Sequence, residues 1–128
     1  MRVLLDTHAF LWWITDDERL SAPARAAISS GDNLIFVSAA TVWEIVVKSR
    51  LGRLPIREQI EGFIPAELEA NAFQPLSITV RHALRLESLP DHHRDPFDRI
   101  LVAQALAEEM PLISGDQAVR AYPVSTIW

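Results

Sequence analysis

The stretch that decides the fold runs from Arg2 to Trp13 and reads RVLLDTHAFLWW. Its first part is a short apolar run that ends at Asp6. From Thr7 onward the apolar residues follow a helical spacing instead. The stretch therefore predicts a buried strand that passes directly into a helix, with a carboxylate at the junction.

The same alternation of short apolar runs and helical patterns continues along the chain. We expect further strands over residues 33–37, 73–78, 111–114 and 124–127. We expect further helices over residues 21–31, 38–52, 57–70, 79–89 and 97–110, and a turn at 115–116. Strands that alternate with helices favour a parallel sheet with right-handed crossovers and helices on both faces. The sequence thus predicts an α/β fold.

Composition narrows the class of protein. The chain has 128 residues, enough for one domain over 1–128, and 49% of them are hydrophobic. It has no cysteine, which excludes disulfides and thiolate chemistry. The first strand begins at Arg2 and leaves no room for a secretion signal before it, so we expect a cytoplasmic protein. No apolar stretch reaches the roughly 20 residues of a membrane span, so we expect no membrane anchor.

A net charge of −5 argues at first against a nucleic-acid partner, because phosphate binding favours a basic surface. The objection weakens if several of the 17 acidic residues face a bound metal ion. Local basic patches could then bind phosphate, although each could equally be a solvated helix face. The candidate basic residues are Lys48, Arg50, Arg53, Arg57, Arg94 and Arg99.

Four acidic residues occupy positions that a parallel sheet would bring together. Asp6 follows the first strand, Asp116 follows the 111–114 strand, and Glu44 lies one and a half turns into the helix after the second strand. Asp98 lies in the first turn of its helix, on the apolar face. Ligands of open parallel sheets bind beyond the carboxyl ends of the strands. We therefore expect these four carboxylates to converge there.

Each acid taken alone has an ordinary structural interpretation as a helix cap, a turn residue or a first-turn acid. Glu44 is the hardest to explain in this way, because an inward carboxylate needs a cation, either Lys48 or a metal. Together the four suit magnesium or manganese and the hydrolysis of a phosphate ester. The hydroxyls of Thr7 and Ser114 could support such a site, or serve as a cap and a turn.

Four segments resemble the PIN-domain ribonucleases, in particular the VapC-type toxins of bacterial toxin–antitoxin pairs. They lie in the family's order across nearly the whole chain. The segments are Leu4 to His8, Ser38 to Ile45, His93 to Arg99, and Ser114 to Asp116.

The resemblance implies a three-layer α/β/α PIN-like fold with a short parallel sheet flanked by helices. It also implies a Mg2+-dependent endoribonuclease, with Mn2+ as a substitute, that cuts tRNA or other structured RNA and leaves a 5′-phosphate. A homodimer and a cognate antitoxin protein are implied as partners. Asp6, Glu44, Asp98 and Asp116 map onto the family's acidic quartet, and Asp95 is a cap or a supporting group.

The residues leave three other interpretations of the function open. Asp91, His92 and His93 match the Asp-His-His signature of another phosphoesterase family, although a solvated loop explains both histidines as well. A receiver-like signalling domain has a similar length, but Thr7 stands where it needs a second acid. A non-catalytic α/β interaction module would bind no magnesium.

The apolar helix 39–51 predicts a dimer or antitoxin surface. Core packing or a partner groove accounts for the four tryptophans more simply than base stacking does.

Overall fold

The computed structural model describes residues 1–54 and 59–128. Its five strands are β1 (Arg2–Leu5), β2 (Leu34–Ser38), β3 (Gln74–Leu76), β4 (Leu112–Ile113) and β5 (Thr126–Ile127). The α-helices of the described residues are α1 (Thr7–Ile14), α2 (Ala22–Ser29), α3 (Ala39–Arg50), α4 (Ile60–Ala70), α5 (Val80–Arg85), α6 (Pro96–Ala107) and α7 (Gln117–Arg120). A 3₁₀ turn, η1 (Leu86–Ser88), extends α5.

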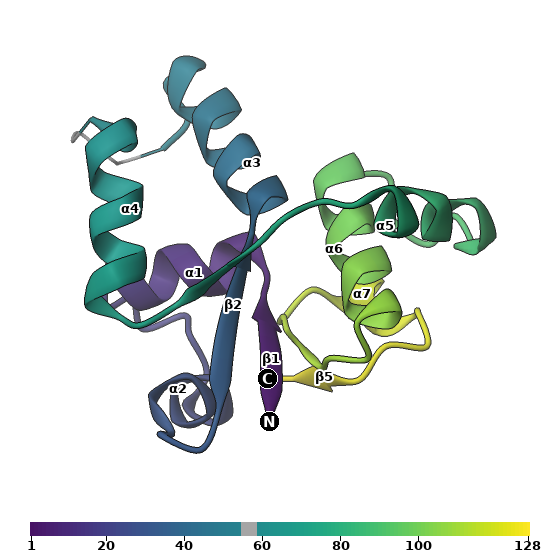
Figure 1. Cartoon of the computed structure of the whole chain (residues 1–128), viewed down its shortest axis with the longest axis horizontal. Helices are drawn as coiled ribbons and strands as arrows, with labels where there is room; N and C mark the ends of the chain where they lie inside the picture. Colours follow the sequence, from purple (N-terminus) through teal and green to yellow (C-terminus); the bar gives the residue numbers. More distant parts are fainter. Residues whose placement is uncertain (55–58) are drawn as a thin grey trace.

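All strand pairs are parallel, and the strands lie in the order β3-β2-β1-β4-β5. Helices α1, α2 and α4 cover one face of the sheet, and α5, α6 and α7 cover the other (Figure 1). The predicted α/β/α architecture with a short parallel sheet is confirmed. Proline at position 75 falls in β3, at the edge of the sheet, where a missing N–H donor is tolerated.

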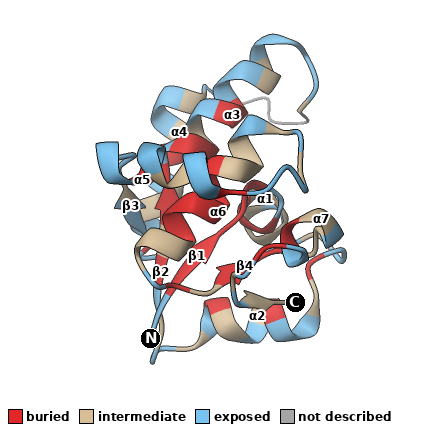
Figure 2. Cartoon of the chain, turned by 90° about the vertical axis from the view of Figure 1, so that its right-hand side faces the viewer, coloured by how far each residue is buried: buried red, intermediate tan, exposed pale blue. Residues whose placement is uncertain are grey.

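The hydrophobic core consists of two clusters, because successive side chains of β1 point to opposite faces of the sheet. Val3 and Leu5 pack with the residues of α1 and α2, whereas Leu4 packs with α6. All three are fully buried, as expected for a central parallel strand with helices on both faces. Figure 2 shows buried residues gathered along the strands and the inner side of α6. The apolar run that opens the sequence is therefore the centre of both cores.

Several predicted boundaries shift. The 79–89 helix divides into α5 and η1, and the 97–110 helix ends at Ala107. The 57–70 helix begins at Ile60 in the described part of the chain, and positions 57 and 58 of that prediction lie outside it. The turn at 115–116 leads into α7, a short helix that the pattern did not predict. None of the described helices is long and apolar enough to cross a membrane.

Helix α3 begins against the sheet and then projects beyond it (Figure 1). The buried residues of α3 are Ala40, Thr41, Glu44 and Ile45. Other apolar side chains of α3 are exposed, so the apolar character predicted on all sides of the helix is present in the single chain. The exposed ones are Trp43, Val46, Val47 and the C-cap residue Leu51.

Candidate active site

The register of the sheet sets the first two acids beside each other. Leu5 of β1 pairs with Ile113 of β4, and the amide N of Asp6 donates to the carbonyl of Ile113 at 3.0 Å. The residues that follow these strands, Asp6 and Ser114, therefore emerge side by side. Ser114 is fully buried, and its hydroxyl hydrogen-bonds the Asp6 carboxylate. The prediction that strand ends deliver polar side chains to one edge is confirmed here.

Asp6 is both a helix cap and a site residue. It is the N-cap of α1, and its Oδ1 accepts from the amide of Ala9 at 2.7 Å. Its side chain is almost completely buried. Burial raises its pKa above the usual value, against the opposing hydrogen bonds from Ser114 and Ala9, and the nearby Asp116 raises it further. Asp6 is thus rigidly held in a place that disfavours its own charge.

Glu44 is enclosed at 2% exposure on the inner side of α3. Its Oε2 forms an ion pair with Lys48 one turn later. Its other oxygen, Oε1, is buried and has no hydrogen-bond partner among the described residues. Both sequence interpretations of Glu44 therefore have support: a lysine partners one oxygen, while the other remains free for a cation. A buried carboxylate oxygen without a partner costs free energy unless something binds it.

Asp98 lies in the first turn of α6, where Asp95 is the N-cap. The Asp95 carboxylate accepts from the amides of Phe97 and Asp98 at 2.8 and 3.4 Å. Asp95 therefore caps α6 through its Oδ1. Burial, followed by repulsion from Asp95, Glu44 and Asp6, raises the pKa of Asp98 to about 7, although His93 acts in the opposite direction.

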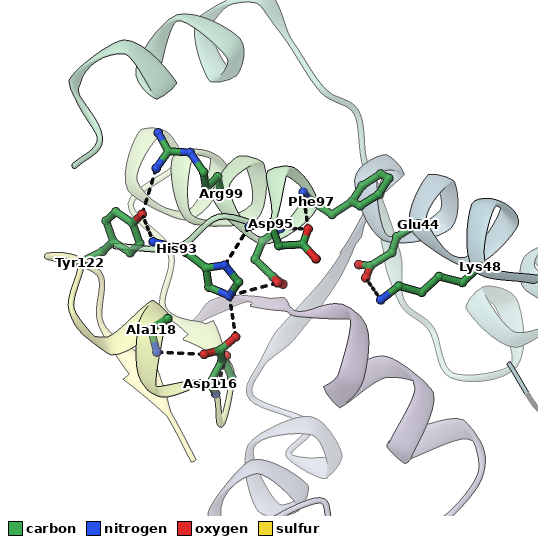
Figure 3. A network of polar contacts seen from close by, with 11 residues as sticks. Glu44, Lys48, His93, Asp95, Phe97, Arg99, Asp116, Ala118 and Tyr122 are labelled. Atoms are coloured by element: carbon green, nitrogen blue, oxygen red, sulfur yellow. Dashed lines mark hydrogen bonds and ion pairs between the residues drawn. The ribbon is translucent and has the colours of Figure 1, made fainter. Parts of the chain in front are cut away.

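Asp116 completes the acidic group from the opposite side. It is the N-cap of α7, and its Oδ1 accepts from the amide of Ala118 at 2.9 Å. Its Oδ2 faces the Nε2 of His93 at 2.7 Å (Figure 3). Partial burial opposes its charge, but the hydrogen bonds from His93 and Ala118 and the nearby histidines lower its pKa overall. Asp116 is therefore the acid whose charge the site stabilises.

Of the interpretations left open for the histidines of the 91–94 loop, a solvated loop fits His92 but not His93. Its side chain is only 15% exposed, and its Nε2 lies 3.3 Å from Asp98 Oδ2 as well as 2.7 Å from Asp116. The Tyr122 hydroxyl accepts from the His93 amide at 3.0 Å and so fixes the loop (Figure 3). His92 remains exposed and packs edge-on against Tyr122. No periodic signal marks His93, although it lies within one of the four matching segments.

Hydrogen bonding assigns the tautomer of His93. Its Nδ1 accepts from the amide of Asp95 at 3.1 Å, so this nitrogen carries no proton in the neutral ring. The proton is then on Nε2, which donates toward the carboxylates of Asp116 and Asp98. His93, Asp98 and Asp116 offer ligand atoms within 4.8 Å of one another. In this tautomer, however, His93 holds the two acids in place and offers no lone pair to a cation.

The remaining candidates are the Thr7 hydroxyl and the basic residues. Thr7 is buried, and its hydroxyl lies 3.1 Å from that of Thr41, which joins α1 to α3. Arg99 is not a free cation for phosphate, because it binds the Pro90 carbonyl and the Tyr122 hydroxyl. Arg50, Arg53 and Arg94 are exposed, and Arg57 lies outside the described residues.

The residues present fit a divalent cation. Four carboxylates influence one another electrostatically, the pKa values of Asp6 and Asp98 are raised, and Glu44 has a buried oxygen without a partner among the described residues. Oxygen ligands of this kind suit magnesium and manganese. A bound cation would neutralise the repulsion that raises the pKa of Asp98.

Comparison with known proteins yields one family and a consistent set of structures. Residues 3–124 match the PIN domain model. The chain is 32% identical to ribonuclease VapC22 of Mycobacterium tuberculosis over 98% of both proteins. A crystal structure of VapBC2 from Rickettsia felis, bound to a DNA fragment from its promoter, superposes with a TM-score of 0.72 at 13% identity over 100% of both chains. A toxin–antitoxin complex from Klebsiella pneumoniae gives a TM-score of 0.63 at 18% identity, covering 98% of this chain and 96% of that one.

Proposed function

Because this chain belongs to the PIN domain family, we propose that residues 1–128 act as one Mg2+-dependent endoribonuclease domain, the toxin of a toxin–antitoxin pair. The relative VapC22, which aligns over nearly its whole length, is named a ribonuclease, and this supports nuclease activity in the present chain. The observation that carries the proposal is the gathering of acids at the carboxyl edge of the sheet. Asp98 and Asp116 offer ligand atoms within 4.8 Å of each other, and Asp6 and Glu44 lie near enough to raise the pKa of Asp98.

Each of the four acids has a separate structural support. Ala9 and Ser114 hold Asp6, and Lys48 holds one oxygen of Glu44. His93 holds Asp116 and Asp98 together from one side. Since these contacts restrict the side-chain rotamers, the carboxylates are preorganised and would bind a cation without a large loss of side-chain entropy.

The chemistry follows from this arrangement. A divalent cation bound by the carboxylates would lower the pKa of a coordinated water and stabilise the charge that develops on a phosphodiester. Asp98, whose pKa burial and neighbouring carboxylates raise, would lose its proton on binding a cation, because the cation would offset the repulsion. An all-oxygen ligand set favours Mg2+, with Mn2+ as a substitute, because His93 keeps its proton on Nε2.

The substrate we propose is RNA, either tRNA or another structured RNA with an unpaired segment, and the site of action is the cytoplasm, where such RNA is found. The products would carry a 5′-phosphate and a 3′-hydroxyl. The test is incubation of a tRNA and structured-RNA pool with and without Mg2+, followed by identification of the product ends. Wild type is compared with Asp98→Asn and with a matched control, Asp91→Asn, whose side chain is 98% exposed on the neighbouring loop.

We expect Mg2+-dependent cleavage by wild type and by Asp91→Asn, and none by Asp98→Asn. Cleavage that persists in a chelator and leaves a cyclic phosphate would point instead to histidine chemistry through His93. Cleavage equal in all three proteins would contradict the role of the carboxylates. A protein that neither cuts RNA nor binds Mg2+ would fit the interaction module.

We propose that the exposed apolar side chains of α3 form the homodimer or antitoxin surface. The support is the exposure of Trp43 at 58%, with Val46 and Val47 beside it, on a helix that projects beyond its own sheet. The R. felis structure is of a VapBC pair, and the K. pneumoniae structure is of a toxin–antitoxin complex. Val46→Lys is expected to weaken self-association or antitoxin binding at least tenfold in sedimentation or titration experiments. A wild-type monomer whose antitoxin complex leaves α3 untouched would overturn this assignment.

A further inference from the structure

A trough begins at the acidic site and leads away from it along α1. Its inner part, with a volume of about 470 Å³, is lined by Asp6, Asp116, Trp12 and Trp128, among others. Its outer part, about 480 Å³, shares Trp12 with the inner part and continues to Arg53. We call this combined hollow the Trp12 trough. Its two parts also share His8 and Arg19.

Flat side chains gather around Trp12. Its ring centroid lies 5.4 Å from that of His8 and 5.8 Å from that of Trp128. The guanidinium carbon of Arg19 lies 4.8 Å from the centroid of the Trp12 ring. Both tryptophans are only partly buried, so part of each ring faces solvent. The core alone therefore does not account for their position.

Trp128 reaches the acidic site because residue 115 is glycine. A Cβ at position 115 would lie 2.4 Å from Cε2 of the Trp128 indole. The close approach thus needs a residue without a side chain, in the turn that leads from β4 to Asp116. The conformation of the turn that carries Asp116 and the position of the Trp128 ring consequently depend on each other.

The electrostatics of the trough suit an uncharged ring better than a phosphate. Arg19 already forms a two-point pair with Asp17, with contacts of 2.7 and 3.0 Å. This pairing offsets its positive charge but leaves a flat face. Asp6 and Asp116 bring negative charge to the inner end. A phosphate would meet this charge, whereas a neutral base could stack on the rings and the guanidinium plane.

We propose that the Trp12 trough binds one unpaired nucleobase of the RNA, adjacent to the phosphate that lies at the carboxylates. The proposal rests on the ribonuclease function proposed above. The trough has room for a single base, since small-molecule sites typically begin at about 300 Å³. Exposed Arg53 at the outer end then lies where the strand would continue, and its cation suits the next phosphate. The trough would restrict cleavage to strands whose bases are free to leave a stack.

The test pairs a protein change with a matching change in the RNA. A single-stranded oligoribonucleotide containing one mapped cleavage site is made intact, and with an abasic residue at each position flanking the scissile bond. Binding is measured by fluorescence anisotropy in the Asp98→Asn background, which prevents cutting, with and without Trp12→Leu. Trp12→Phe is measured as well, because it keeps an aromatic ring at position 12. Trp13→Leu is the matched control, since Trp13 binds Asn71 and packs on Phe73 instead of lining the trough.

We expect Trp12→Leu to weaken binding of the intact oligonucleotide about tenfold, the usual effect of losing one stacked base. One of the abasic oligonucleotides should bind the protein that keeps Trp12 about tenfold more weakly than the intact oligonucleotide does. The Trp12→Leu protein should bind that abasic oligonucleotide and the intact one equally well. Trp12→Phe and Trp13→Leu should bind nearly as well as the parent. Arg19→Ala, a change of a mainly exposed side chain, should also weaken binding, and it needs no change in the core.

The proposal would be overturned if the affinity losses caused by Trp12→Leu and by the abasic residue multiply when the two changes are combined. Full affinity for the intact oligonucleotide in both Trp12→Leu and Arg19→Ala would also overturn it. The wild-type cleavage that maps the site separates the two hypotheses. If wild type cuts the RNA and the losses multiply, the base site is wrong and the nuclease stands. If wild type does not cut any RNA, both are wrong.

Discussion

The raised pKa of Asp98 predicts that removing its charge stabilises the metal-free protein. A pKa of about 7 in the folded protein, against 3.8 for an ordinary aspartate, means that the folded state binds this proton more tightly than the unfolded state does. The charge on Asp98 therefore destabilises the fold fully above about pH 7, and not at all below about pH 4. Between these values, stability should fall as the pH rises.

The size of the effect follows from the shift. At about 1.4 kcal/mol for each pKa unit, the difference corresponds to about 4 kcal/mol, and solvent at this partly open site makes that an upper limit. Asp98→Asn has nearly the same shape without the charge. In a chelator at pH 8, we expect the variant to be more stable than wild type by up to about 4 kcal/mol, and at pH 4 by little.

The assay is urea unfolding at pH 4, 6 and 8 in the presence of a chelator, repeated at pH 8 with excess Mg2+. Mg2+ should raise the stability of wild type much more than that of Asp98→Asn, because the cation relieves a repulsion that the variant lacks. Equal stabilities at pH 8 in the chelator, or a difference that does not change with pH, would refute the reasoning.

Three further predictions follow from individual contacts. Lys48→Met leaves Glu44 buried without a cation, so the metal-free protein should lose about 3 kcal/mol in urea unfolding, and Glu44→Gln in the same chain should restore most of it; no recovery would contradict the ion pair. Gly115→Ala should displace the Trp128 indole, which would shift tryptophan emission to the red at a cost of about 1 to 2 kcal/mol, and an unchanged spectrum would argue against the close approach. His93→Leu should lower Mn2+ affinity about tenfold, measured by the electron paramagnetic resonance signal of free Mn2+, whereas undiminished affinity would remove His93 from its positioning role.

The fold could be predicted from the sequence wherever a segment is strongly patterned. The run from Val3 to Leu5 is apolar throughout because β1 is buried on both faces, and such a strand needs no alternation. Asp95 was expected to be a helix cap or a supporting group, and it is the cap of α6; such a role can be predicted because cap chemistry is local. Helix α7 was missed because four residues are too few to show a period.

The prediction that Glu44 faces inward is correct, yet Val47 and Leu51, which helical spacing places on the same side three and seven residues later, are exposed. The difference arises because α3 extends past the sheet. A periodic pattern indicates which residues share a face, but it does not indicate where the supporting layer ends. That limit depends on strand lengths elsewhere in the chain.

For Asp6 and Asp116, the cap and site interpretations were treated as alternatives, and the structure shows that both can hold. In Asp116, Oδ1 accepts from the helix amide while Oδ2 faces His93. His93 itself could not be predicted, because 23 residues separate it from Asp116 and no periodic spacing connects them. Only the folded chain brings the loop before α6 to the turn after β4.

The central claim is that the four converging carboxylates form a divalent metal site. Calorimetric titration of Mg2+ into the wild-type protein at pH 7.5, with Glu44→Gln as the comparison, tests it most directly, because Glu44 carries the buried oxygen without a partner. The account predicts saturable binding by wild type, proton release as Asp98 ionises, and binding weakened at least tenfold in Glu44→Gln. Equal binding by the two proteins, or no binding by wild type, would contradict it.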